Sequence, residues 1–202
     1  TVVRQIPIGT PMVYRESCFS LAGDSVCGKS LDDRSCFTAL LRAAELLKDK
    51  DLDVDVYFMG SVREEVSGTG AIVGTNTVAP DWCIAVDVTF ASTPDISADE
   101  VPNKLRGGPV IGMGPNMTWW MTDRMIEKAK ALELPYQFEV MAGHTGTNGW
   151  GMQTCLEGIP TSVVSLPLKY MHSPIEVISL TDIEWTAQLL AAFTEGLGKE
   201  GA

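Results

Sequence analysis

The sequence is short of basic residues and of paired cysteines, and each shortage excludes a class of protein. Its 15 Lys and Arg residues stand against 26 Asp and Glu residues, which gives a formal net charge of -11. Such an acidic chain offers no basic field to a phosphate backbone or an anionic lipid surface, so we expect no nucleic-acid partner and no membrane partner. The five cysteines are odd in number and form no CxxC pair, which argues against a disulfide framework and against a zinc knuckle.

Long apolar runs are also lacking. No run approaches the roughly 20 residues that a membrane-spanning helix needs, and the first residues lack the basic start and apolar core of a signal peptide. We therefore expect a cytoplasmic protein. The 202 residues, 45% of them hydrophobic and 20% charged, can bury one sizeable core in one main domain. Because the chain opens on Thr1 rather than Met, we expect a processed or truncated product.

The apolar pattern predicts strands that alternate with helices. Residues 1–29 are rich in β-formers interrupted by glycine and proline, which predicts short strands joined by turns. Further strands are predicted over residues 54–59, 83–88, 136–141 and 161–166. Helices are predicted over residues 33–48, 68–79, 123–132 with Thr122 as N-cap, 149–156, and 181–197 with a capping box of Thr181 and Glu184. This order is typical of the α/β class, and specifically of an α/β/α sandwich with a mostly parallel sheet.

Acidic residues and histidines follow the predicted strands at the points where the strands end. The set comprises Glu64, Glu65, Asp87, His144 and His172, with Asp32 and Asp33 just before the first long helix. Ligands in open α/β sheets bind outside the carboxyl ends of the strands. If the four strands are parallel, they bring these side chains to one edge of the sheet.

Each of these residues also has an ordinary structural explanation. An acidic pair before a helix usually serves the helix dipole, and Glu64 with Glu65 in a polar loop is usually a solvated pair. His172 alone could be an ordinary loop histidine. Asp87 is harder to dismiss, because a carboxylate at the end of an apolar strand needs a partner or a metal. Convergence of so many such residues by chance would be rare.

Carboxylate and imidazole ligands without thiolate suit zinc, manganese or cobalt. Two such ions about 3.5–4 Å apart need one carboxylate that bridges them, and Asp32 is the natural bridge. A water activated there needs a nearby base, and an adjacent glutamate pair offers one base and one ligand. Glu64 and Glu65 form such a pair.

Four segments carry a resemblance to a known family. They are GKSLDDR at residues 28–34, REEV at 63–66, AVDVT at 85–89 and YMHSPIE at 170–176. In order and spacing they resemble the M42 metallopeptidases, which include glutamyl and tetrahedral aminopeptidases and relatives labelled endoglucanase M. Residues 107–111 and 143–147 resemble family segments as well. The resemblance implies the C-terminal catalytic portion of a di-metal aminopeptidase that releases N-terminal amino acids from peptides.

The resemblance also implies roles for individual residues. Asp32 would bridge the two metals, Glu65 and His172 would complete one metal site, Asp87 would belong to the other, and Glu64 would be the general base. Arg34 would support the Asp32–Asp33 pair or be a surface charge. Asp33, His144 and Asn148 are candidates for an outer shell or for substrate contacts.

Two departures from the family pattern bear on activity. A further metal-binding His, in a His-x-Asp element, and most of an inserted small β domain are absent, so we expect one or both divalent ions (zinc, cobalt or manganese) to bind weakly or not at all. Residues 1–20 are expected to be a remnant of that insertion and residues 21–202 the catalytic domain. His144 is a weak candidate to replace the absent ligand. Asn148 stands where the family carries an Asp.

Three hypotheses follow. The chain is part of an active aminopeptidase acting on a peptide substrate, or it is a non-catalytic assembly or binding protein on a degenerate peptidase scaffold. A glycosidase is disfavoured, because its two carboxylates stand about 5–9.5 Å apart across a sugar, whereas Glu64 and Glu65 are adjacent. The family resemblance also implies a homo-oligomer. Trp119, Trp120 and Met121 could form an apolar contact face for it or could belong to the core.

Overall fold

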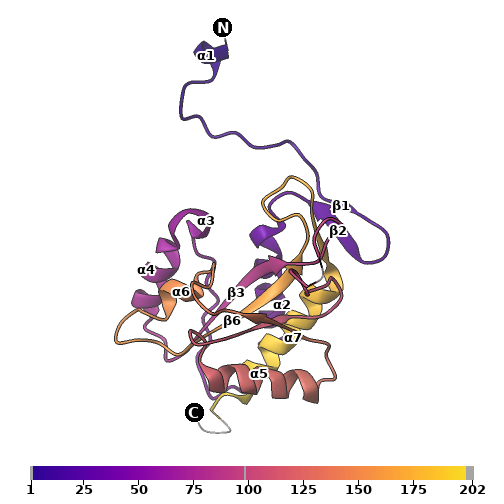
Figure 1. Ribbon diagram of the computed structural model, residues 1–202. Helices are drawn as coiled ribbons and strands as arrows, with labels where there is room; N and C mark the ends of the chain where they lie inside the picture. Colours follow the sequence, from indigo (N-terminus) through magenta and orange to yellow (C-terminus); the bar gives the residue numbers. More distant parts are fainter. Residues whose placement is uncertain (1, 98, 199–202) are drawn as a thin grey trace.

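A four-stranded sheet in the order β3-β6-β4-β5 forms the centre of the molecule (Figure 1). Its strands are β3 (Cys83–Phe90), β4 (Val110–Met113), β5 (Gln137–Val140) and β6 (Thr161–Leu168). β3 runs parallel to β6 and β4 runs parallel to β5, whereas β4 and β6 are antiparallel. The computed structural model describes residues 2–97 and 99–198. All eight residues of β6 are buried, because this strand lies inside the sheet and is covered on both faces.

Helices cover both faces of this sheet, as the sequence predicts for an α/β/α sandwich (Figure 1). The helices α2 (Leu31–Leu47), α5 (Trp119–Ala131) and α7 (Leu180–Gly196) share one core cluster with β4 and β6. The shorter α4 (Thr69–Val78) and α6 (Gly149–Met152) share a second cluster with β3 and β6. Phe193, Met121 and Met125 are among the largest fully buried side chains of the first cluster.

A second, smaller sheet lies beside the carboxyl ends of β3 and β6. It has the order β1-β2-β7, with β1 (Phe19–Ser20), β2 (Ser25–Gly28) and β7 (Glu176–Ser179), and both of its pairings are antiparallel. In its register, Gly28 is the partner of Glu176. This pairing brings the start of α2 next to the loop between β6 and β7, although about 140 residues separate them in the chain.

The sheet differs from the sequence prediction in three places. Residues 54–59 form no strand, because an alternating apolar pattern does not by itself provide a neighbouring strand to pair with. β4 was not predicted, since it follows a Gly107-Gly108-Pro109 turn signal and is only four residues long. The expectation of four parallel strands is wrong, because β4 and β5 run opposite to β6.

Several helix boundaries also differ from the predictions. α5 begins at Trp119 rather than at residue 123, because Trp120 already packs edge-on against Trp82 with ring centroids 6.3 Å apart. Thr122 is therefore a buried residue inside the helix, and its hydroxyl donates to the Gly112 carbonyl rather than capping a helix end.

The predicted capping box of α7 is wrong as well. Ser179 is the N-cap, and its hydroxyl accepts a hydrogen bond from the Asp182 backbone N–H. The helix predicted over 149–156 is the single turn α6, because residues 153–157 form turns and a bend.

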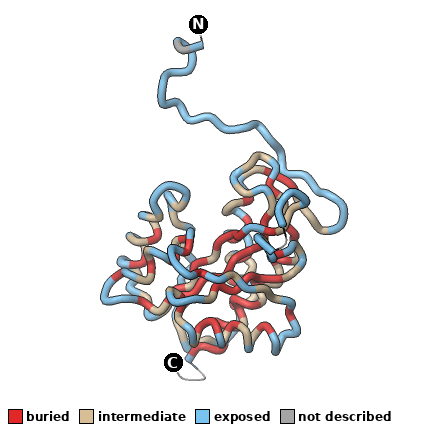
Figure 2. The backbone as a smooth tube through the Cα atoms, in the orientation of Figure 1, coloured by how far each residue is buried: buried red, intermediate tan, exposed pale blue. Residues whose placement is uncertain are grey.

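The N-terminal residues extend away from the rest of the molecule (Figures 1 and 2). The strands predicted over residues 1–29 are reduced to β1 and β2, and Val2–Gln5 form a short helix, α1. Residues 4–23 are exposed, and within this range Phe19 and Ser20 alone pair with another strand, β2. Among the described residues, no helix combines the length and the apolar character needed to cross a membrane.

Candidate metal centre

Three side chains from separate segments converge where β3 and β6 end. Asp32 lies at the start of α2, Glu65 lies on the short helix α3 (Glu64–Ser67), and His172 lies in the loop between β6 and β7. His172 Nε2 lies 3.0 Å from Asp32 Oδ2 and 3.3 Å from Glu65 Oε2. One ligand atom from each of the three lies within 4.8 Å of the others, which is compact enough for one metal ion.

A second group of ligand atoms shares a member with the first. Asp32, Asp33 and Asp87 offer carboxylate oxygens that also lie within 4.8 Å of one another. Asp87 is buried on β3, and its Oδ1 accepts a hydrogen bond of 2.8 Å from the Val88 N–H. Asp32 is the one side chain common to both groups. The peptide bond between Asp32 and Asp33 is cis.

Burial and crowding raise the pKa of these carboxyl groups. Burial raises the pKa of Asp87 to about 9, and the charge of Asp33 adds to it. Burial likewise raises the pKa of Asp33 to about 7. For Asp32, burial and then the charge of Glu65 raise the pKa to about 6, although His172 opposes the shift. A divalent cation held among these carboxyl groups would favour their charged forms.

Glu64 and Glu65 lie on a helical turn rather than in the open polar loop expected from the sequence. The turn is bounded by Arg63 and Gly68, both in the left-handed region with φ of 65° and 64°. Glu64 is half-buried, and burial followed by the charge of Glu65 raises its pKa. Glu64 belongs to neither group of ligand atoms, yet it lines the same hollow as Asp32 and Asp87. Its carboxylate is thus next to the metal groups without being one of their ligands.

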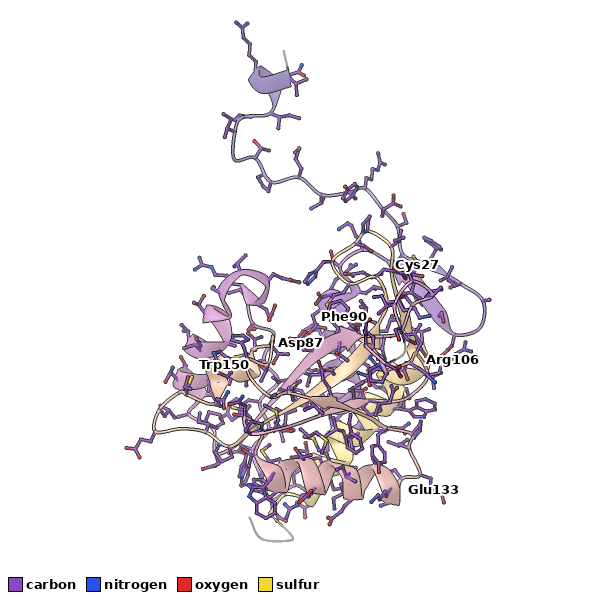
Figure 3. The ribbon with its side chains drawn as sticks, in the orientation of Figure 1. Cys27, Asp87, Phe90, Arg106, Glu133 and Trp150 are labelled. Atoms are coloured by element: carbon purple, nitrogen blue, oxygen red, sulfur yellow. The ribbon has the colours of Figure 1, made fainter. Side chains whose placement is uncertain are left out.

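The hollow continues from the acidic groups toward aromatic side chains. Phe90 at the end of β3 and Trp150 on α6 lie on either side of Asp87 in the view of Figure 3, and all three line the hollow. The His144 ring stacks at a tilt on Trp150, with centroids 4.6 Å apart. His144 lines the hollow but belongs to neither ligand group of the described residues. It arrives by the loop after β5, since β5 itself points to the opposite edge of the sheet.

The other two candidates from the sequence have different surroundings. Asn148 also lines the hollow, and its Nδ2 donates to Ser61 Oγ at 3.0 Å, while its buried Oδ1 has no hydrogen-bond partner. The hydrogen bonds of Arg34 go to backbone carbonyls and not to the carboxylates of Asp32 and Asp33. Its guanidinium donates to the backbone carbonyls of Ser30 and Lys29 and so ties down the loop before Asp32.

Glu176 was not singled out by the sequence reasoning. It is only 2% exposed, and its Oε2 accepts hydrogen bonds from the Leu31 and Asp32 N–H groups while its Oε1 accepts from the His172 N–H. An acidic residue at the start of a short apolar strand, four positions after His172, was the available signal. The sequence does not say that this carboxylate is buried against the segment around Asp32.

The donor set fits divalent metals. Both groups offer carboxylates, one adds an imidazole, and neither contains a thiolate, which is the ligand chemistry of zinc, manganese or cobalt. A carboxylate shared by two ligand groups is what a pair of neighbouring ions requires.

Comparisons with known proteins identify a matching family and several named relatives. The family described as M42 glutamyl aminopeptidase matches residues 2–189. Over 167 residues the chain is 39% identical to lysyl aminopeptidase of Pyrococcus furiosus, covering 83% of this chain and 47% of that protein. Over 187 residues it is 26% identical to glutamyl aminopeptidase of Lactococcus lactis, covering 92% and 52%.

Solved structures with the same fold include two peptidases. Aminopeptidase APDkam598 from Desulfurococcus kamchatkensis has a TM-score of 0.84 at 29% identity, covering 94% of this chain and 56% of that one. The Pyrococcus horikoshii TET1 peptidase, which assembles into a tetrahedron or a large octahedral shell, has a TM-score of 0.76 at 29% identity, covering 92% and 54%. This chain spans about half the length of the curated relatives that it matches. On the match to nearly its whole length, the chain belongs to the M42 glutamyl aminopeptidase family.

Proposed function

We propose that this chain carries the metal-binding part of an aminopeptidase active site, which releases amino acids from the N-terminus of peptides. The observation that carries the proposal is that two compact groups of ligand atoms share Asp32. The names of the relatives support peptidase activity. Because the chain spans about half of those relatives, the activity of the whole polypeptide is part of the proposal.

In this proposal Asp32, Glu65 and His172 would hold one ion, and Asp32 and Asp87 would hold the other, with Asp33 close by. Divalent zinc, cobalt or manganese held there would supply Lewis-acid chemistry that polarises a peptide carbonyl. The hollow lined by Asp32, Asp87 and Trp150 is where the peptide N-terminus would lie.

Glu64 acts as the general base. Its carboxylate lines the hollow and is not taken up by either ligand group, so it can accept a proton from the attacking water and pass it to the leaving amine. Its neighbour Glu65 faces His172, so the two adjacent glutamates have separate tasks.

We also propose homo-oligomeric assembly and keep a cytoplasmic location as a prediction. Assembly is supported by the shells that the TET1 relative forms. Trp119 is 75% exposed and remains available for such a contact, whereas Met121 is fully buried and Trp120 packs on the core.

The test combines metal content with hydrolysis of a panel of aminoacyl anilides in zinc, cobalt or manganese. It is run on this chain alone and with the N-terminal segment that the family resemblance implies. We expect hydrolysis of at least one aminoacyl anilide when zinc, cobalt or manganese is bound. We expect Glu64→Gln to keep the metal but to lower kcat by about 100-fold or more. Metal binding without turnover in every form, together with retained peptide binding, would instead support a binding protein on a peptidase scaffold.

A further inference from the structure

We propose that Glu176 is a positioning residue of the metal centre, which aligns the Asp32 and His172 ligands through their backbones. The proposal rests on the proposed metal centre, but it concerns a residue outside both ligand groups. In this proposal the buried carboxylate of Glu176 connects two segments that are far apart in the chain.

The two oxygens of Glu176 face different segments. Oε2 accepts from the Leu31 N–H at 2.7 Å and from the Asp32 N–H at 3.2 Å. Oε1 accepts from the His172 N–H at 2.8 Å. The carboxylate therefore spans the gap between the start of α2 and the loop between β6 and β7. The side chains of Asp32 and His172 themselves come within 3.0 Å of each other.

Because Glu176 is buried, each of its hydrogen bonds is costly to lose. Glu176 is 2% exposed, so solvent cannot replace a lost hydrogen bond to any of the three N–H groups. Leu31 is buried as well, so its N–H would also be left without a partner. Replacing one acceptor oxygen by an amide group would set N–H against N–H at one end of the carboxylate.

The backbone at His172 needs such support. His172 has φ of 61° and Tyr170 has φ of 59°, in the left-handed region that non-glycine residues seldom adopt. Ser30, two residues before Asp32, also has a positive φ, of 54°. Conformations of this kind persist where the surroundings over-determine them. Glu176 supplies a hydrogen bond at each of these turns, at Leu31 on one side and at His172 on the other.

The small sheet explains why Glu176 is in this place. Glu176 opens β7 and pairs with Gly28 of β2, so the strand before Asp32 and the strand after His172 are neighbours. The sheet sets the two loops side by side, and the carboxylate fixes the remaining distance between them. Outer partners of metal ligands typically change metal affinity by about 10–100-fold when they are removed.

The test is Glu176→Gln, with Asp182→Asn as the matched control. Asp182 is also a fully buried carboxylate that accepts two backbone N–H groups, from Arg106 and Gly108, but it touches neither ligand group. Both variants are compared with the parent protein by thermal unfolding in EDTA and by Co²⁺ titration followed through the visible absorption of the ion.

We expect Glu176→Gln to lower Co²⁺ affinity by about 10–100-fold and to change the Co²⁺ spectrum. Asp182→Asn should lose stability while its Co²⁺ affinity and spectrum stay at the parent values. Equal Co²⁺ affinity and spectrum in Glu176→Gln and the parent would overturn the positioning role, as would an equal loss in both variants. A parent protein that binds no Co²⁺ would overturn the metal centre itself, which separates that failure from a failure at Glu176.

A second measurement needs no variant. In the zinc-loaded protein, the amide protons of Leu31 and His172 should exchange with solvent at least about 100-fold more slowly than those of exposed loops. Exchange as fast as in exposed loops would show that the carboxylate does not hold these N–H groups and would refute the proposal.

Discussion

Asp32 occupies the position where the two groups of ligand atoms meet, and at the residue scale we expect the proposed metal centre to depend on it more than on any other candidate ligand. Glu65 and His172 belong to one group only, and Asp87 belongs to the other. Loss of the shared ligand should therefore weaken both bound ions, whereas loss of an unshared ligand should weaken only one.

The first prediction compares Asp32→Asn with Glu65→Gln. We expect Asp32→Asn to weaken every bound divalent ion by at least about 100-fold, because direct ligation counts for more than outer-shell support. Glu65→Gln should remove at most one ion per chain. Equilibrium dialysis with zinc and mass-spectrometric metal analysis measure both. If Asp32→Asn retains the parent's metal content, Asp32 is not a bridge.

A second prediction concerns Asp24, which lies in the turn between β1 and β2. The hydroxyl of Ser179 and the Thr181 N–H donate to it, and the Arg106 guanidinium pairs with it. These contacts, with Ser179 first, hold the pKa of Asp24 well below its ordinary value of 3.8. We expect Asp24→Asn to lower the free energy of unfolding by about 1–3 kcal/mol at pH 6.

The pH dependence of this difference has a definite sign. A carboxyl group with a lowered pKa in the folded state stabilises the protein above its unfolded pKa and loses that effect as the pH falls through the folded value. The gap between the parent and Asp24→Asn should thus be constant from pH 6 to about pH 5 and shrink below pH 3.8. Urea unfolding at several pH values measures it, and a gap that widens toward low pH would contradict the assignment.

At the scale of elements, α5 has one face in the core and one face in solvent. Met121, Met125 and Ala129 follow helical spacing and are completely buried, whereas Trp119 at the first turn is 75% exposed. The helix is held by its buried face, since an isolated helix of 13 residues is marginal in water.

The third prediction contrasts two large-to-small changes on α5. Met121→Ala should cost about 2–5 kcal/mol, because it leaves a cavity in the main core. Trp119→Ala should change the free energy of unfolding of the monomer by no more than about 0.5 kcal/mol. Chemical unfolding at low protein concentration compares them. A large loss in Trp119→Ala that grows with protein concentration would place Trp119 in a contact between copies.

The observed bounds of the helices and strands can be compared with those predicted from the sequence pattern. Long amphipathic helices such as α2 and buried strands such as β3 and β6 were predicted close to their observed positions. β4 and β7 were missed, since each has only four residues and so shows little of a period, whereas the equally short β5 was predicted as part of a longer run over residues 136–141. The N-cap of α7 was misplaced by two residues, since both Ser179 and Thr181 are suitable capping types and only the packing selects Ser179.

At the scale of the whole molecule, the proposed metal centre draws its candidate ligands from four separate segments. Asp32, Glu65, Asp87 and His172 come from α2, α3, β3 and the loop before β7. An ion bound among them would link the small sheet, the central sheet and the α3–α4 segment. A ligand that binds only the folded state stabilises it by mass action.

The fourth prediction follows from this linkage. With free metal at about 100 times Kd, one site adds roughly 2.7 kcal/mol, which raises the Tm of a chain of this size by roughly 5–11 °C. Differential scanning calorimetry with Mn²⁺, Co²⁺ or Zn²⁺, and then with excess EDTA, measures the shift. Asp32→Asn is the control, and with its affinity lowered by at least about 100-fold it should shift by no more than about 2 °C. An equal rise in Asp32→Asn would assign the effect to metal bound elsewhere.

The sequence by itself determined the fold class, because strand and helix periods are local properties. It also pointed to acids and histidines that line the hollow, although the four parallel strands expected to bring them together do not form. The candidate roles of these residues remain predictions. Only the tertiary structure decided that β4 and β5 run opposite to β6, that His144 stacks on Trp150, and that Glu176 is buried against Leu31 and Asp32. Those features depend on pairing between segments that are far apart in the chain, and a local pattern carries no information about its distant partner.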